Sequence, residues 1–319
     1  GDKVQVLIDA TPVLTGYVHE FQGELDKGDG HGPGHHWMTC TLRDQTQDFI
    51  DSTVGPKLKL KAPIPLKDVL KKTLGVMGLG HIGVVDHINP EVFKHGEVVS
   101  AAIDDRGFAF AEKFAEKRQV LLGTDGKGNI TIDRNRRIRA GGALISLFED
   151  SPLNNVKKSS FRNSDKDRHN THAVNGQKST TDRDHWESKP KGESTAQADP
   201  VQKDWGTAHD TGVRSERRMH TRGGKGLAGA TPKKTAKWRS NVAKGRGFQY
   251  TATVAGFYMQ SGQLWWPNKI IQVNDPHWEL EGEFLICDVR FKKTWHGGSI
   301  TEVTVTLPDA YTEDDEGPK

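Results

Sequence analysis

The chain has 319 residues, of which 34% are hydrophobic and 35 are glycine. This composition favours a β-rich protein with many turns. No stretch approaches about 18 consecutive apolar residues, so we expect no membrane-spanning helix. The two cysteines, Cys40 and Cys287, are too few for a disulfide framework or a cysteine-based zinc site. We expect both to be buried thiols in strands of a protein made in a reducing compartment.

The net charge of +3 conceals an uneven distribution along the chain. From Lys157 to Arg246 the sequence carries 21 Lys and Arg against 10 Asp and Glu, a local net charge of +11. A basic segment of this kind fits a nucleic acid or an acidic protein neighbour as a partner. It fits a solvated, partly flexible loop equally well.

The first part of the chain is predicted to be a β domain over residues 1–57. Residues 3–25 alternate in short strands that turn near residues 10–12, and a third strand is predicted over residues 36–44. Three successive strands of this kind form an antiparallel meander. Gly16, inside a strand, indicates a bulge or a close approach of two backbones.

The hydrophobic period changes in the next region, which we assign to a small inserted α/β domain over residues 58–145. Apolar residues at helical spacing predict a helix that begins after Pro65, and a second helix is predicted over residues 106–116. The sequence QVLLGTDGKGNITI then predicts a β-hairpin with DGKGN as its turn.

The last part, residues 146–319, is predicted to be a second β domain. It contains a polar, basic and partly flexible insertion around residues 178–230. A helix is predicted to begin at Pro232. Four strands are predicted after it, in the sequences FQYTATVAGF, KIIQVND, EFLICDVRFKK and SITEVTVTLP.

Two motifs suggest a ligand at first sight. Gly78, Gly80 and Gly83 have the GxGxxG spacing of a dinucleotide-binding loop, but they follow a predicted helix where that loop follows a strand. We therefore interpret them as a helix C-cap and the turn after it. The loop sequence HGPGHHW is the second, because His31, His35 and His36, with Asp29 nearby, have spacing that zinc or nickel accepts. No further ligand completes this set, so a surface loop is the preferred interpretation.

No pattern in the sequence predicts catalysis. GxSxG, HExxH and P-loop motifs are absent, and Asp104 and Asp105 fit the N-cap and first turn of the following helix. We therefore predict no catalytic, cofactor-binding or metal-binding residue and no cofactor. Aromatic residues interleaved with the basic ones leave a single-stranded nucleic-acid site as an alternative, although Trp238 also fits a helix-to-core anchor. They are Trp186, Trp205, Trp238, Phe248 and Tyr250.

The sequence GQLWWPNKIIQVND contains adjacent tryptophans at the entrance to a predicted strand. In extended backbone Trp265 and Trp266 point to opposite faces, so they do not form one stacking surface. We expect one of them to fill the core of its domain and the other to meet a neighbouring domain or subunit. Pro267 marks the start or the edge of the strand. The candidate packing and interface residues are Gly16, Tyr17, Trp265, Trp266 and Pro267.

Three stretches together resemble the baseplate hub proteins of Mu-like contractile-tailed phages, which are related to the hub module of VgrG spikes and to T-even phage hubs. They are VLTGYV with RDQTQDFID near the N-terminus, then GEVVSAAIDDRGFAF through GTDGKGNITI, and finally GQLWWPNKIIQVND with EFLICDV and GGSITEVTVTLPDAY. The resemblance covers most of the chain and is weakest over residues 178–230. Family members begin with further strands, so the first β domain is expected to lack its opening strands here.

The resemblance implies an α+β, β-rich fold with two antiparallel, barrel-like tube domains, the inserted α/β domain and the basic excursion. It also implies a homotrimer whose ring adapts a sixfold tail tube to a threefold central spike around a channel for DNA ejection. The implied partners are the tail tube protein, the spike, the baseplate wedge proteins and DNA as passing cargo, without stable membrane insertion. The implied location is the tail baseplate of a virion, assembled in the host cytoplasm. A cell-wall-degrading or nucleotide-using enzyme of the tail and a basic nucleic-acid-binding module are the alternatives.

Overall fold

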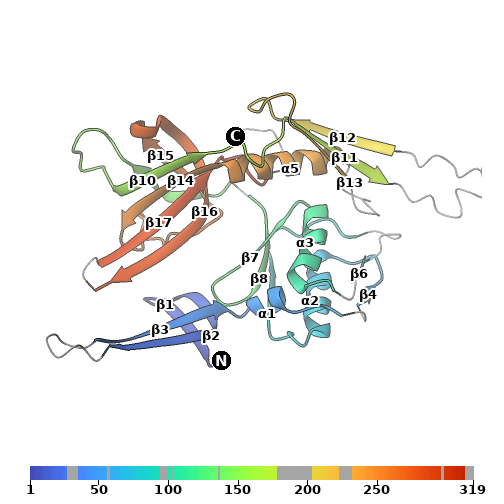
Figure 1. Cartoon of the computed structure of the whole chain (residues 1–319), viewed down its shortest axis with the longest axis horizontal. Helices are drawn as coiled ribbons and strands as arrows, with labels where there is room; N and C mark the ends of the chain where they lie inside the picture. The colour runs from blue at the N-terminus through green and yellow to red at the C-terminus, as the bar shows by residue number, and fades with distance from the viewer. Residues whose placement is uncertain are drawn as a thin grey trace, which may run out of the picture. The chain divides into compact units, whose positions relative to one another are not determined.

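The computed structural model describes residues 1–26, 35–55, 58–93, 99–101, 104–135, 137–177, 203–222, 232–295 and 298–312. The chain forms two compact units. Unit 1 contains residues 1–116 and 120–133, and unit 2 contains residues 117–119 and 134–319. Their elements are shown in Figure 1.

Unit 1 begins with a three-stranded antiparallel sheet in the order β1-β2-β3, as predicted for a meander. Two small sheets and three helices follow, and α2, α3 and the strand β8 supply much of one hydrophobic core. The elements of unit 1 are β1 (Lys3–Ile8), β2 (Thr11–Asp26), β3 (His35–Asp44), α1 (Gln47–Asp51), β4 (Lys59–Leu60), α2 (Leu66–Val76), β5 (Val84–Asp86), β6 (Val99–Ser100), α3 (Gly107–Lys117), β7 (Leu121–Thr124) and β8 (Ile130–Asp133).

Helix α2 shows why the local sequence signals succeed in this unit. The fully buried side chains of Leu66, Leu70 and Leu74 lie on one face at helical spacing. The helix ends at a Schellman motif, in which the Leu79 N–H donates to the Leu74 carbonyl at 2.8 Å and Gly78 has a φ of 76°. The predicted C-cap at Gly78 is therefore confirmed, and the GxGxxG spacing belongs to a helix end.

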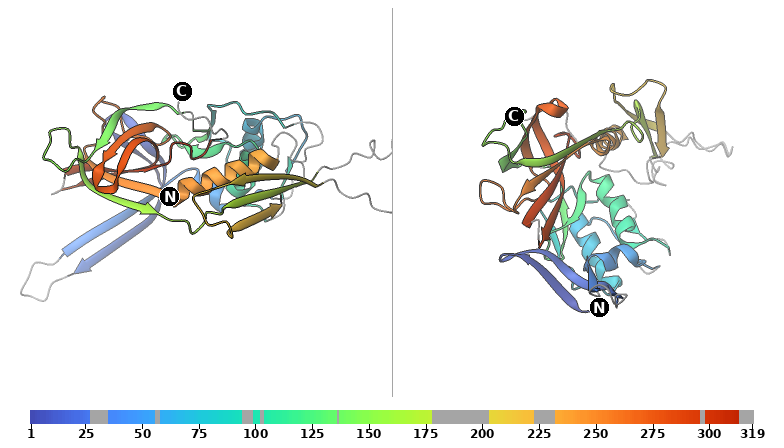
Figure 2. Two further views of the ribbon diagram at one scale, coloured as in Figure 1. Left: turned by 90° about the horizontal axis from the view of Figure 1, so that it is seen from above. Right: turned by 60° about the vertical axis from the view of Figure 1, so that its left-hand side comes forward.

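Unit 2 is built on a six-stranded sheet in the order β10-β14-β17-β16-β15-β9, with a hydrophobic core on its inner face. Figure 2 shows this sheet curled into part of a barrel. The pair β9 and β15 is parallel and the other neighbours are antiparallel. The elements of the sheet are β9 (Arg139–Ile145), β10 (Val156–Asn163), β14 (Phe248–Ala255), β15 (Ile270–Asp275), the short helix η1 (Pro276–Trp278), β16 (Leu280–Thr294) and β17 (Gly298–Thr306). The predicted β-rich fold class is confirmed.

A second, three-stranded sheet in unit 2 has the order β12-β11-β13 and packs against the long helix α5. Together they form what we call the α5 lobe, comprising β11 (Thr171–Gln177), β12 (Lys203–His209), β13 (Arg218–Arg222), α5 (Pro232–Gly247) and the turns between β12 and β13 and before β11. Gly206 lies against the first turn of α5, where a Cβ would overlap the backbone of Pro232 and Lys233. Within the stretch expected to be a polar excursion, residues 203–222 thus form two strands. The rest of residues 178–230 lies outside the described residues.

Candidate assembly interface

The β2–β3 hairpin has two chemically different faces. Residues paired across an antiparallel ladder point to the same side of the sheet. The pairs Phe21–Cys40 and Leu25–His36 therefore share one face with Met38, which is paired with Gly23. The pairs on the other face are polar apart from Trp37, and they are Glu20–Thr41, Gln22–Thr39 and Glu24–Trp37.

The apolar side chains continue as a stripe toward β1. A bulge leaves His19 unpaired, so that Val18 pairs with Leu42 and stays on the same face as Phe21. Through the pairing of β1 with β2, Val6 and Leu14 also lie on this face. We call this set the apolar stripe, defined by Val4, Val6, Leu14, Val18, Phe21, Leu25, Met38, Cys40 and Leu42.

The outer half of the apolar stripe is exposed in the chain. The side chains of Phe21, Leu25 and Met38 are 64%, 63% and 59% exposed. Among the described residues of this sheet, Ile8 and Thr15 are the only buried side chains. A sheet with one apolar, uncovered face is a strong indication of a surface that another protein covers.

The opposite face of the sheet is held by hydrogen bonds to the β7–β8 hairpin of the same unit. Thr15 Oγ1 donates to the Gly126 carbonyl at 3.0 Å, and Gln5 Nε2 donates to Thr15 Oγ1 at 3.1 Å. Gln45 Nε2 donates to the Gly128 carbonyl at 2.9 Å. These bonds fix the sheet at its base and leave the apolar stripe on the unattached side.

The expected close approach at Gly16 is present. A Cβ on Gly16 would overlap the carbonyl oxygen of Arg43, which lies near the end of β3. Tyr17 pairs with Arg43 and is half-buried. Only glycine fits at position 16 without a change in the pairing of β2 with β3, so Gly16 is needed for packing within the hairpin.

The two tryptophans of unit 2 differ in burial. Trp265 is 2% exposed and belongs to the core of the six-stranded sheet, whereas Trp266 is half-buried. Pro267 and Asn268 form a bend before β15, and Asn268 has a φ of 63° with its N–H donating to the Ile286 carbonyl at 2.8 Å. The assignment of Trp266 to an interface stays a prediction.

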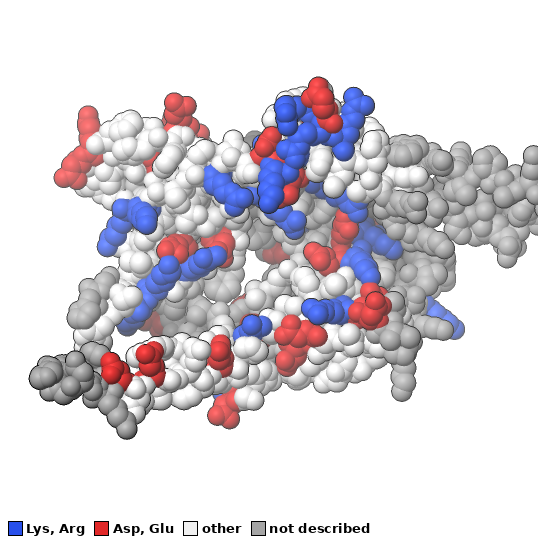
Figure 3. All heavy atoms as spheres, viewed as in Figure 1, with Lys and Arg blue, Asp and Glu red and all other residues white. Residues whose placement is uncertain are grey.

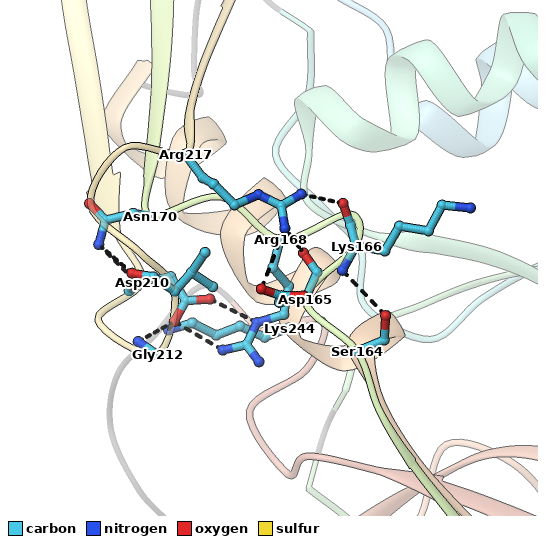
Figure 4. A network of polar contacts seen from close by, with 10 residues as sticks. Ser164, Asp165, Lys166, Arg168, Asn170, Asp210, Gly212, Arg217 and Lys244 are labelled. Carbon is cyan, nitrogen blue, oxygen red and sulfur yellow. Dashed lines mark hydrogen bonds and ion pairs between the residues drawn. The ribbon is translucent and has the colours of Figure 1, made fainter.

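A polar network organises the turns of the α5 lobe (Figure 4). Arg168 donates to both oxygens of Asp210, at 3.0 and 3.1 Å, and Lys244 Nζ lies 3.7 Å from the same carboxylate. The Asp210 side chain is 4% exposed. Burial alone would raise the pKa of Asp210, but the hydrogen bond from Arg168 and the charge of Lys244 outweigh it and hold that pKa below its ordinary value.

The surface of the α5 lobe is strongly basic. Residues 164–177, 203–222 and 232–247 contain 13 Lys and Arg against 5 Asp and Glu, and Figure 3 shows Lys and Arg gathered over this lobe. The aromatic residues that are described in this part of the chain are used in packing. Trp238 is 5% exposed and contacts Tyr311, Tyr250 is fully buried, and Phe248 stacks on Phe284 at 5.5 Å. They therefore offer no exposed base-stacking platform, and Trp238 is confirmed as a helix-to-core anchor.

The histidine loop HGPGHHW is only partly described in the structure. Asp29 and His31 lie outside the described residues, while His36 pairs with Leu25. Within the described ranges, no group of three or more His, Cys, Asp or Glu side chains is placed to hold a metal ion. The side chains of Trp186 and Trp205 are likewise outside the described part.

The prediction that both cysteines are buried is wrong, because Cys40 is exposed on the apolar stripe and Cys287 is half-buried in β16. No helix that the structure describes has the length and apolar character needed to cross a bilayer.

Comparison with known proteins supports the expected family. Residues 228–314, from α5 through β17, match the fourth domain of the Mu phage baseplate assembly protein GpP. No curated protein sequence matches the chain. The resemblance to baseplate proteins of Mu-like phages is thus confirmed over this domain.

Solved structures show the same fold across nearly the whole chain. The 43 kDa tail protein of prophage MuSo2 from Shewanella oneidensis is 21% identical, with a TM-score of 0.72 over 97% of this chain and 82% of that one. The tail protein of Neisseria meningitidis MC58 is 18% identical, with a TM-score of 0.75 over 97% of this chain and 86% of that one. The prophage tail protein gp18 from Listeria monocytogenes EGD-e is 8% identical, with a TM-score of 0.53 over 92% of this chain and 77% of that one. These likenesses establish the fold.

Sequence reasoning predicted helix α5 from Pro232 but missed the apolar stripe and the three strands of the α5 lobe. The apolar residues of β2 and β3 were visible, but the bulge at His19 changes which of them share a face. The strands of the α5 lobe are polar, and a parallel pairing such as that of β11 with β13 leaves no local sequence signal.

Proposed function

We propose that the chain is a structural hub protein of a contractile phage-tail baseplate. The observation that carries this proposal is the match of residues 228–314 to the fourth domain of a Mu phage baseplate assembly protein. The match covers α5 and the strands β14 to β17, which make up the greater part of the six-stranded sheet. The role is mechanical, because the sheet and its core provide a wall.

We further propose that the protein assembles as a homotrimer in which the apolar stripe lies at the subunit contact. Phe21, Leu25 and Met38 expose most of their side-chain surface. Removal of such apolar surface from water favours association. A closed ring uses a heterologous contact, so the stripe meets a different surface on the next copy.

The remaining partners follow from the same role. The ring joins a sixfold tail tube to a threefold spike, contacts the wedge proteins of the baseplate and lets DNA pass through its channel. We propose that the protein functions in the virion after assembly in the host cytoplasm, without stable membrane insertion. We also propose that it is not an enzyme, as expected for a member of a structural baseplate family.

The oligomeric state tests the trimer directly. We expect light scattering after size-exclusion chromatography to give a trimer at micromolar concentration, and electron microscopy to show a threefold ring. A stable monomer at that concentration contradicts the proposal.

A pair of matched variants tests the contact. Met38 and Thr39 are neighbours on β3 with side chains on opposite faces of the hairpin. Met38→Lys places a charge on the apolar stripe and is expected to lower trimer formation at least tenfold. Thr39→Lys adds the same charge on the polar face and is expected to leave the trimer intact. Equal effects of the two variants contradict a contact on the stripe.

The two alternative functions have their own tests. Clearing of purified peptidoglycan would support a tail enzyme. Filter binding of single-stranded DNA at two salt concentrations would support a nucleic-acid-binding module if the affinity falls steeply with salt. We expect neither activity from the purified chain.

A further inference from the structure

His172 occupies an unusual position inside the α5 lobe. It lies on β11, the central strand of the three-stranded sheet, and is 5% exposed. Val174 pairs with Gly206, where an added Cβ would overlap the backbone at the start of α5, so this face of the sheet is the one that packs against the helix. His172 lies two residues before Val174 and therefore points to the same face.

The His172 ring is poorly provided with hydrogen-bond partners. Its Nε2 atom is buried and has no partner among the described residues. The ring of His169 lies at a centroid distance of 5.5 Å and is nearly perpendicular, and the Nδ1 atom of His169 is buried without a described partner as well. Neither His172 Nε2 nor His169 Nδ1 therefore has an acceptor for an N–H among the described residues.

The charges that face His172 are mostly positive. Helix α5 contributes Arg239 and Lys244, and the segment before β11 contributes His169. From the strands beside it, the paired residues Ala208 and Met219 carry no charge. Asp210 is the one anion that acts on His172 in this set, and it is already bound by Arg168 and Lys244.

We propose that the contact between α5 and β11 is an acid-sensitive latch, which is closed while His172 is neutral and opens when its ring takes up a second proton. A second proton would need an acceptor for the Nε2 N–H and would place a cation beside Arg239 and Lys244. Separation of α5 from the sheet supplies water to the ring and relieves the repulsion. The contact that opens lies inside the α5 lobe, between α5 and its three-stranded sheet, and the six-stranded sheet stays folded.

The direction of the pH dependence follows from linkage. Burial, His169 and the cations of α5 together hold the pKa of His172 below its ordinary value of 6.5. The closed state then binds fewer protons than the open state, so the latch loses stability as the pH falls below 6.5 and continues to lose it until the pKa of the closed state is reached. For one proton, the population of the open state rises by at most about tenfold per pH unit.

Hydrogen–deuterium exchange of the full chain, followed by mass spectrometry and corrected for the intrinsic pH dependence of amide exchange, tests the latch. We expect the protection of β11 and α5 peptides to fall by up to about tenfold per pH unit as the pH is lowered below 6.5. Peptides of β14 serve as the internal reference and should keep their protection. An unchanged β11 protection, or an equal loss in β14, overturns the proposal.

Three variants assign the effect to His172. His172→Gln removes the titrating group and should abolish the pH dependence of β11 protection. His209→Gln changes an exposed histidine of the neighbouring strand β12 and should keep the wild-type dependence. If His172→Gln fails to fold, Lys244→Met is used, because removal of this cation brings the pKa of His172 closer to its ordinary value and should reduce the total loss of protection. A wild-type pH dependence in His172→Gln, or in Lys244→Met, overturns the proposal.

Discussion

The hydroxyl of Tyr250 donates a 2.8 Å hydrogen bond to Oδ2 of Asp275, although two strands separate them in the sheet. Tyr250 lies on β14 and Asp275 ends β15, with β17 and β16 between them. The bond spans the inner face, and it is possible only because the sheet curls. Asp275 also caps η1 by accepting from the His277 N–H at 3.2 Å, so one carboxylate ties the sheet to the turn that follows β15.

We expect Tyr250→Phe to destabilise unit 2 by about 1–3 kcal/mol, because it leaves an oxygen of the fully buried Asp275 without its donor. Burial and the Asp275 carboxylate hold the pKa of Tyr250 above its usual range, so the hydroxyl remains a donor at pH values where an ordinary tyrosine ionises. Chemical denaturation measures the loss. A variant with unchanged stability would show that the bond makes no net contribution.

The adjacent tryptophans should give different results on truncation. Trp265→Ala removes a core side chain that is 2% exposed and should cost about 3–5 kcal/mol of unfolding free energy. Trp266→Ala should cost less stability and instead lower self-association, since Trp266 is only half-buried in the chain. Thermal unfolding and light scattering on both variants separate the effects. If both variants kept wild-type stability and assembly, the assignment of Trp265 to the core and of Trp266 to an interface would be contradicted.

The ion pair of Arg168 and Asp210 should contribute to stability in a pH-dependent way. Arg168→Met leaves a buried carboxylate with the Gly212 N–H and Lys244 as its partners and should destabilise the α5 lobe by about 3–5 kcal/mol at neutral pH. Because the pKa of Asp210 is lowered in the folded chain, its contribution is complete above the ordinary value of 3.8 and is lost as the pH falls through the lower, folded value.

Acid titration of unfolding checks this second part. The wild-type chain should lose stability below about pH 3.8 more steeply than Arg168→Met. Arg214→Met, which removes an exposed arginine of the same lobe, should behave like the wild type. If Arg168→Met lost stability more steeply with acid than the wild type, the assignment of the lowered pKa of Asp210 to its pairing with Arg168 would be contradicted.

The two thiols should react at very different rates. Cys40 is exposed on the apolar stripe, whereas burial, with the nearby Asp288, raises the pKa of Cys287 to about 11 and its thiol donates to the Thr304 carbonyl. In the Met38→Lys variant, whose stripe should not be covered by a second copy, iodoacetamide at about pH 8 should label Cys40 first, since the thiolate is the reacting form. Peptide mass spectrometry reads the two sites separately, with Cys40→Ser as the control. Faster labelling of Cys287 would contradict the burial described for β16.

Local signals predicted the parts of the fold whose causes are local. Helix α2 follows from leucines at helical spacing with a glycine beyond its end, and β14 to β17 follow from alternation of apolar and polar residues. β10 and β11 were not predicted because their sequences, VKKSSFRN and THAVNGQ, are mostly polar. They are strands because distant partners complete their ladders, as β14 does for β10.

The candidate interface was harder to predict than the core. Tyr17 and Gly16 were identified from the sequence, yet the exposed residues of the stripe lie farther along the same strand, beginning at Phe21. The sequence shows that these residues are apolar. Which side of the sheet each one occupies depends on the pairing partner, and that is a property of the folded hairpin.

The single unpaired residue in β2 also constrains how the chain can change in length. Deletion of His19 would remove the bulge and keep every pair of the ladder, so Val18 and Phe21 would stay on one face by regular alternation. Deletion of a paired residue such as Gln22 would instead move Leu25 to the side that carries Glu20. Viable single-residue deletions in this strand should therefore occur at the unpaired position, while deletions at paired positions are eliminated more strongly than most substitutions.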